Sequence, residues 1–219
     1  MSSGRSDRAD GQRPFRLRNT LWAVVAVALW APAPASAFDA AIEDMYTQIS
    51  ISPPTTNLVV VCHGFGCRFR TAVGLSNADH SKLKQMFASA KKTPEAERKA
   101  IATATSWFDR RIGPEAGTTR RVAYAGVRSD QGPEQMDCID MSRNNTSLLL
   151  LLDQLGLLKH HKVESPRARG NLLDNRWPHA TAVLRETTSG RQWAVDNWTH
   201  KFGEGPDVKP LDEWLKDGY

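Results

Sequence analysis

The sequence predicts an α+β fold in which one buried central helix packs against an antiparallel sheet. Five consecutive leucines at residues 148–152 are apolar on every side of a helix, so this helix must be buried. Two short apolar runs, 177–184 and 190–198, flank a turn and predict two antiparallel strands. Between residues 96 and 112, apolar side chains recur three or four positions apart, which is typical of an amphipathic helix.

Residues 1–37 have the layout of a secretory signal peptide. An arginine-rich start is followed by the apolar run 21–30 and by an Ala-Ser-Ala ending. We expect cleavage before Phe38 and export to the periplasm or the extracellular space; the alternative is an uncleaved N-terminal anchor. The apolar run is too short to span a bilayer, so we expect no stable membrane insertion after cleavage.

The composition of the rest of the chain is that of a globular protein. Of the 219 residues, 40% are hydrophobic and 24% are charged. Removing residues 1–37 takes away five arginines and two aspartates, so the formal charge falls from +5 to +2. No basic stripe with interleaved aromatic residues remains, so we do not expect nucleic-acid binding. We predict a single domain over residues 38–219.

A hairpin stapled by a disulfide is predicted near the start of this domain. A short helix over 38–51 precedes a strand, a turn containing two glycines and a return strand, from about residue 57 to 75. Cys62 and Cys67 flank the turn, so an oxidising compartment favours a disulfide between them. The alternatives are a redox pair and a metal site that uses His63. Because no further ligands cluster nearby, we predict no metal.

Two helices and a loop follow the hairpin. Asn77 or Asp79 is expected to cap a helix of about ten residues. Thr93, followed by a proline in the first helical position, predicts the start of the amphipathic helix. We expect that helix to end at the Gly-Pro pair 113–114, and residues 115–134 to form mostly loop.

The chain after the leucine-rich helix carries further signals. Gly156 ends that helix late, and the polar run 159–161 is expected to be a solvated helix end. Trp177 and Trp198 flank the strand pair, and core packing is the simpler role for both. Residues 210–215 predict a short final helix.

Three side chains are placed where they can carry nucleophilic chemistry. Cys138 begins the buried helix, where the positive end of the helix dipole favours a thiolate. His179 begins the first strand of the pair, and Asp196 is near the end of the second. The turn at 187–190 is midway between them, so they should come out nearly opposite one another. An imidazole can exchange a proton with the thiol, and a carboxylate can orient the imidazole. The arrangement predicts a catalytic triad.

This order of residues resembles the transglutaminase-like branch of the papain-like cysteine enzymes, in particular its bacterial cysteine-proteinase members. The segment Asp137-Cys138-Ile139-Asp140 resembles the sequence context of their nucleophile, and Trp193 precedes the acidic residue as an aromatic does there. The resemblance covers about residues 131–198. It implies a papain-like core, acyl transfer through a thioester and no cofactor. It also implies a catalytic core at 131–219 that follows N-terminal helices and the disulfide hairpin at 38–130.

An acyl-transfer site also needs donors for the developing oxyanion. The backbone N–H of Cys138 is one natural donor, and a side-chain amide from Gln131 or Gln135 is the candidate for the second. We therefore expect an exported monomeric hydrolase or acyltransferase for peptide or glutamine-type amide bonds. Its substrate would be a peptide, a protein or a peptidoglycan peptide. The alternatives are a non-catalytic exported binding or scaffold protein with an inert Cys138, and a thiol–disulfide protein that uses all three cysteines.

Overall fold

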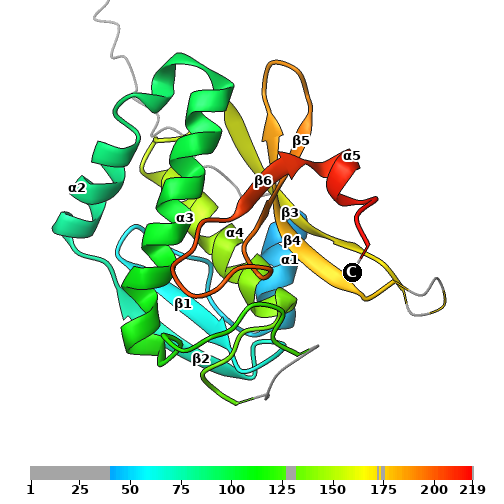
Figure 1. Ribbon diagram of the computed structural model, residues 1–219. Coiled ribbons are helices and arrows are strands. Elements are labelled where there is room, and N and C mark those ends of the chain that lie inside the picture. The colour runs from blue at the N-terminus through cyan, green and yellow to red at the C-terminus, as the bar shows by residue number, and fades with distance from the viewer. Residues whose placement is uncertain (1–39, 127–131, 172, 174–175, 219) are drawn as a thin grey trace, which may run out of the picture. The chain divides into compact units, whose positions relative to one another are not determined.

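The computed structural model describes residues 40–126, 132–171, 173 and 176–218. The predicted leader, its cleavage site before Phe38, and Gln131 lie outside this part of the chain. The predicted α+β class is confirmed, since the described elements are α-helices and strands in two antiparallel sheets (Figure 1). The elements are α1 (Ala40–Gln48), β1 (Leu58–His63), β2 (Phe69–Gly74), α2 (Asn77–Met86), the 3-10 helix η1 (Ala90–Lys92), α3 (Pro94–Ala116), α4 (Cys138–Gln154), β3 (His161–Arg169), β4 (His179–Glu186), β5 (Gln192–Asp196), β6 (Asp207–Pro210) and α5 (Leu211–Trp214).

The disulfide-bridged hairpin forms as the sequence predicts. Strands β1 and β2 pair antiparallel along their full length, and Cys62 and Cys67 form a disulfide with a Cα–Cα distance of 4.5 Å. His63 Nδ1 lies 2.6 Å from the carbonyl oxygen of Pro133, and its Nε2 lies 3.0 Å from Thr71 Oγ1. One ring nitrogen therefore ties the hairpin to the segment before α4, and the other links its two strands, which is a structural role for this histidine.

A polar side chain caps the start of both α2 and α3. Ser76 caps α2, and Asp79 returns the interaction from the third helical position, so the prediction of Asn77 or Asp79 as the cap was wrong by one residue or more. Thr93 caps α3, and its hydroxyl accepts a hydrogen bond from the N–H of Ala96 (3.1 Å), as predicted.

The predicted end of α3 was wrong. The helix passes through Gly113 and Pro114 and stops at Gly117, which has a left-handed φ of 72°. Pro114 removes one backbone N–H donor from the helix, and the helix ends within three residues of it. The small size of Gly113 serves packing, since a Cβ there would lie 2.4 Å from the ring of Phe202.

Helix α4 is central and buried, as its leucines predict. All five leucines are at most 2% exposed. The helix contacts β1 of one sheet and β3, β4 and β5 of the other, and α3 packs on it from a further side (Figure 1). Helix α1 docks on it through Ile42 and Leu150 and through a 2.7 Å hydrogen bond between Tyr46 and Ser147. The described residues thus form one compact unit around α4.

The larger sheet has the order β3-β4-β5-β6. The pairing of β4 with β5 confirms the predicted hairpin, and α5 confirms the predicted final helix. Strands β3 and β6 are the two edges, and both escaped the sequence analysis. Among the described residues, no helix has the length and apolar character needed to cross a membrane.

The polar run at 159–161 is not a solvated helix end, so that expectation was wrong. His161 begins β3 and is 1% exposed, and its Nδ1 lies 2.8 Å from the carboxylate of Glu97 on α3. The same carboxylate accepts hydrogen bonds from the backbone N–H groups of Lys159 and His160. Burial raises the pKa of Glu97, but these hydrogen bonds outweigh it and the pKa lies below its ordinary value. A buried acceptor on α3 therefore lets His161 enter the core, while Lys159 stays exposed and His160 half-buried.

Candidate active site

Cys138 is the first residue of α4, where a double cap fixes the helix start. Asp137 is the N-cap, and its side chain accepts a hydrogen bond from the N–H of Asp140 (2.8 Å). The carboxylate of Asp140 in turn accepts from the N–H of Asp137 (3.3 Å). This reciprocal cap leaves Cys138 in the first turn of the helix, as the sequence predicts.

The turn of the disulfide hairpin is folded onto these two carboxylates. The four residues from Gly64 to Cys67 all have left-handed φ angles, between 62° and 75°. The N–H groups of Phe65 and Cys67 donate to Asp140 (2.8 and 2.5 Å), and the N–H between them donates to Asp137 (3.0 Å). Non-glycine residues adopt this conformation at a cost, so the disulfide and the carboxylates together hold the turn. The hairpin thereby braces the residues on either side of Cys138.

The titration of Asp140 gives a testable effect on stability. Burial and the neighbouring Asp137 carboxylate raise the pKa of Asp140 to about 7. A carboxyl whose pKa is higher in the folded state stabilises the fold fully below its unfolded pKa, and this stabilisation is lost as the pH rises to about 7. Between about pH 4 and pH 7, the wild type should therefore lose stability relative to Asp140→Asn by up to about 1.4 kcal/mol per pH unit.

Urea denaturation of both proteins across this pH range measures the difference. Asp79→Asn is the matched control, because hydrogen bonds from Ser76 and Arg111 outweigh burial and lower the pKa of Asp79. Its contribution has the opposite sign and is lost only as the pH falls below about 4. Parallel curves for the wild type and Asp140→Asn between about pH 4 and pH 7 would contradict the assignment.

The structure brings His179 and Asp196 together across the β4–β5 hairpin. Nε2 of His179 lies 2.5 Å from Oδ2 of Asp196. The register pairs Ala182 with Val195, so His179 and Asp196 are diagonal neighbours rather than directly opposite. An offset of two residues keeps both side chains on the same face of the sheet and within reach.

The carboxylate of Asp196 has three hydrogen-bond donors around it. Besides His179, the indole N–H of Trp214 donates to Oδ2 (2.8 Å), and the backbone N–H of Trp198 donates to Oδ1 (3.2 Å). Burial raises the pKa of Asp196, but the hydrogen bonds outweigh it and hold the pKa below its ordinary value. The carboxylate is therefore ionised and fixed, which is what orienting an imidazole requires.

Aromatic rings enclose the imidazole. The ring of His179 lies 4.6 Å from that of Trp198 and 5.3 Å from that of Trp214. Trp198 is 2% exposed, which confirms its predicted core role. Trp177 is 43% exposed, so its predicted core role was wrong. The sequence offered no signal for Trp214, which reaches the site from α5.

Cys138 and His179 open onto one pocket. It has a volume of about 330 Å³. The neighbours of the Cys138 sulfur include the backbone N–H groups of Ala180 and of Cys138 itself, which favour the thiolate. The site thus joins the start of α4 to the start of β4. The residues lining this pocket are Cys138, Ile139, Ala168, Trp177, Pro178, His179 and Ala180.

The thiol does not have the lowered pKa that its helix position predicts. Burial, together with the carboxylates of Asp137 and Asp196, raises the pKa of Cys138 to about 11. Desolvation of a thiolate therefore outweighs the N–H groups and the helix dipole. The resting form of Cys138 is the neutral thiol, and any activation must come from proton transfer during attack.

Gln135 braces a loop. Its side-chain oxygen accepts from the N–H of Val122 (3.0 Å), and its side-chain nitrogen donates to the carbonyl of Arg120 (3.3 Å). Its backbone carbonyl accepts from Gly64 (2.8 Å). These bonds account for its burial. The other candidate oxyanion donor, Gln131, lies outside the described residues.

Two buried asparagines on α4 were not singled out from the sequence. Asn144 bonds both the N–H and the carbonyl of Cys62 (2.8 Å each), so it clamps the hairpin to α4. Asn145 donates to the side chain of Asn197 (2.8 Å) and to the carbonyl of Val195 (3.2 Å), on either side of Asp196. Paired amides beside a leucine run were the available signal, because buried polar groups need partners.

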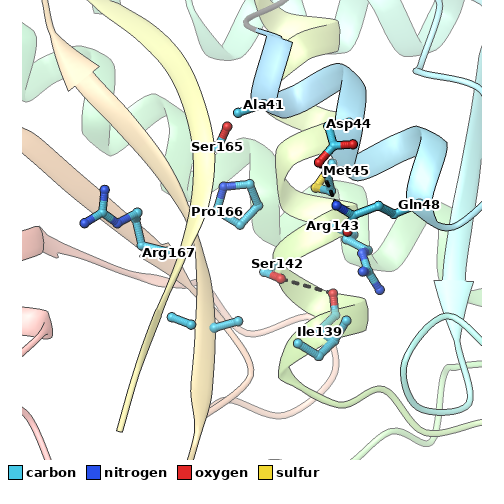
Figure 2. Close-up of a pocket in the computed structure, with 12 residues that line it drawn as sticks. Ala41, Asp44, Met45, Gln48, Ile139, Ser142, Arg143, Ser165, Pro166 and Arg167 are labelled. Carbon is cyan, nitrogen blue, oxygen red and sulfur yellow. Dashed lines mark hydrogen bonds between the residues drawn. The ribbon is translucent and has the colours of Figure 1, made fainter.

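A second pocket adjoins the first. It has a volume of about 220 Å³ and shares Ile139, Ala168 and Ala180 with the pocket of Cys138. Figure 2 shows it between α1 and β3, with Met45 on one side and Pro166 on the other.

In the described part of the chain, no three histidine, cysteine, aspartate or glutamate side chains gather where they could hold a metal ion. Comparison of the chain with family models, curated proteins and solved structures gives no match. The functional argument therefore depends on the geometry of the site.

Proposed function

We propose that this protein is a cysteine-dependent hydrolase or acyltransferase that acts on peptide or glutamine-type amide bonds through Cys138, His179 and Asp196. The observation that carries the proposal is the 2.5 Å bond between His179 and Asp196, with His179 lining the same pocket as Cys138. A helix that carries the cysteine and packs on a sheet that carries the other two supports assignment to a papain-like, transglutaminase-like core.

The chemistry follows from the protonation states. Because Nε2 of His179 bonds the carboxylate, its Nδ1 is the nitrogen that exchanges protons with the thiol. As the Cys138 sulfur attacks the carbonyl carbon, Nδ1 accepts the thiol proton and then passes it to the leaving amine nitrogen. The C–N bond breaks and a thioester remains. Water or an amine resolves the thioester and gives up a proton through the same imidazole.

The start of α4 supplies electrostatic support for this step. The backbone N–H of Cys138 is among the first four of the helix, which have no partner within the helix. It can donate to the oxyanion that develops on the attacked carbonyl. The site is proposed to need no cofactor, since thioester chemistry uses only these side chains and the substrate.

The cell compartment is part of the proposal. The leader-like residues 1–37 and the Cys62–Cys67 disulfide support export to the periplasm or the extracellular space, where disulfides persist. Both cysteines are 0% exposed, which counts against exchange with Cys138. Peptides, proteins and peptidoglycan peptides are the substrates we propose for a monomeric enzyme in that setting.

A second candidate is a non-catalytic binding or scaffold protein with the same fold. The raised pKa of Cys138 favours it, because a neutral, largely buried thiol is unreactive unless a base assists it. The two candidates differ in whether His179 activates the thiol.

Acylation by 4-nitrophenyl acetate separates them. We expect a burst of 4-nitrophenol, an acetyl adduct on Cys138 in the mass spectrum, and a rate at least about 100-fold lower in His179→Ala. His200→Ala, which removes a part-exposed imidazole elsewhere, should react like the wild type. If the folded protein forms no adduct while the urea-unfolded protein does, the catalytic proposal fails and the binding protein remains.

A further inference from the structure

The pocket beside Cys138 is apolar, and this bears on what the thiol attacks. No lining residue carries a charged side chain apart from the reacting pair itself. Ile139 follows Cys138 on α4, and Trp177 faces the pocket from the segment before β4. A large aromatic that is 43% exposed leaves apolar surface in water, which a bound apolar group would cover.

Two small side chains, Ala168 and Ala180, form the floor of the pocket. Ala168 of β3 and Ala180 of β4 are directly paired in the sheet, so their methyl groups lie on the same face. Larger side chains at these positions would occupy the space next to the sulfur. A volume of about 330 Å³ is therefore available to a substrate side chain.

Charge next to the pocket disfavours an acidic occupant. Besides burial, which is the larger cause, the nearby carboxylates of Asp137 and Asp196 disfavour the anionic form of the Cys138 sulfur. They would equally repel a carboxylate placed beside it. A polar amide would also lose hydrogen bonds to water in an apolar pocket and find few partners in return.

The adjoining pocket gives room for more than a single acyl group. Beyond the shared floor, the walls become mixed: Pro166 of β3 lies opposite Asp44, Met45 and Gln48 of α1 (Figure 2). Arg143 and Arg167 also line this second pocket. A chain that runs from one pocket into the other passes Ile139, Ala168 and Ala180, which line both, and Cys138 lines the first of the two. An extended peptide can fill both pockets, whereas a small amide fills only one.

We infer that the acyl donor is a peptide whose carbonyl-bearing residue has an apolar side chain, held between Trp177 and Ile139, rather than a glutamine side-chain amide. This inference depends on the proposed function. It makes Trp177 a specificity-determining residue, since its ring is the wall that the substrate side chain contacts.

A set of N-acetyl-aminoacyl 4-nitrophenyl esters tests the inference. We expect the leucyl ester to acylate Cys138 about 10-fold faster than the glycyl ester, and the glutamyl ester to react more slowly than the glycyl ester. Trp177→Ala should lower the leucyl-to-glycyl ratio about 10-fold, and Ala168→Leu should lower it by filling the pocket. Leu173→Ala, an exposed apolar residue that does not line the pocket, should leave the ratio unchanged.

The glycyl ester separates the two possible failures. If it does not acylate Cys138, the proposed function is wrong. If it acylates Cys138 but the leucyl and glutamyl esters react at the same rate, the proposed function stands and the specificity inference is overturned. A leucyl-to-glycyl ratio that is unchanged in both Trp177→Ala and Ala168→Leu would overturn it as well.

Discussion

Replacing Asp196 with asparagine is expected to slow the acylation of Cys138 by about 10³–10⁴-fold. The carboxylate accepts three hydrogen bonds, from His179 Nε2, Trp214 Nε1 and the backbone N–H of Trp198. An asparagine must turn its NH₂ group toward one of these donors. Of the three, only the imidazole can become an acceptor.

The loss follows from the tautomer that results. When the NH₂ group takes the place of Oδ2, it faces both His179 and the indole N–H of Trp214. Nε2 of His179 then becomes the acceptor, Nδ1 carries the proton, and the indole loses its acceptor. The imidazole then cannot take the proton of the Cys138 thiol. When the NH₂ group instead faces the backbone N–H of Trp198, two donors meet in a buried site and the asparagine is displaced. Either arrangement removes the general base.

The measurement is the rate of 4-nitrophenol release, with thermal denaturation alongside to show that the variant folds. Asp212→Asn is the matched control, because that side chain is 65% exposed and does not line the pocket. It should react at the wild-type rate. A folded Asp196→Asn protein that acylates within about 10-fold of the wild type would remove Asp196 from the proposed triad.

Asp109→Ala is expected to lower the free energy of unfolding by about 3–5 kcal/mol. Asp109 on α3 and Arg121 form an ion pair with side chains only 4% and 1% exposed. The carboxylate also accepts the N–H of Gly203 (2.7 Å), and the guanidinium donates to the carbonyls of His200 and Lys201. Removing the carboxylate leaves a buried guanidinium without its counter-charge.

Two comparisons distinguish this cause from general damage. The double variant Asp109→Ala with Arg121→Met should lose less than Asp109→Ala alone, because no unpaired charge remains. Lys99→Ala removes one partner of an ion pair whose side chains are 77% and 67% exposed, and should change stability by less than about 1 kcal/mol. Urea denaturation measures all three. If Asp109→Ala loses less than about 1 kcal/mol, the pair does not stabilise the fold as argued.

Much of the architecture could be predicted because it depends on local patterns. The leucines of 148–152 require burial on all sides, and α4 is the central helix. The turn at 187–190 implies a hairpin, and β4 and β5 form it. Cys62 and Cys67 are bridged because the hairpin brings them close along the chain. Each of these features is determined within a few tens of residues.

The features that escaped prediction depend on distant partners. The sequence of β3 is mostly polar and contains Pro166. The strand pairs only with β4, and its register shifts between Glu164 and Arg167. Such an edge strand gives little alternation to detect. His161 is buried only because Glu97 accepts from it. No local pattern in the sequence predicts the contact with Glu97.

In the site too, local features could be predicted and contacts from distant elements could not. The meeting of His179 and Asp196 follows from the hairpin, although the pairing is diagonal because the register centres one residue later than the sequence suggested. The bond from Trp214 and the clamp from Asn144 come from other elements and were not found. The pKa of Cys138 was expected to fall, because the helix dipole is visible in the sequence while the depth of burial is not.

The left-handed turn at 64–67 limits how far this protein can be divided into modules. A fragment starting near residue 131 would contain Cys138, His179 and Asp196, yet it would lose the three N–H groups that the turn places on Asp137 and Asp140. Each carboxylate would then keep only the hydrogen bond of the reciprocal helix cap, and the two would repel each other beside Cys138. Transplanting Cys138, His179 and Asp196 into another scaffold would therefore require the hairpin as well, so the smallest transferable unit spans both halves of the chain.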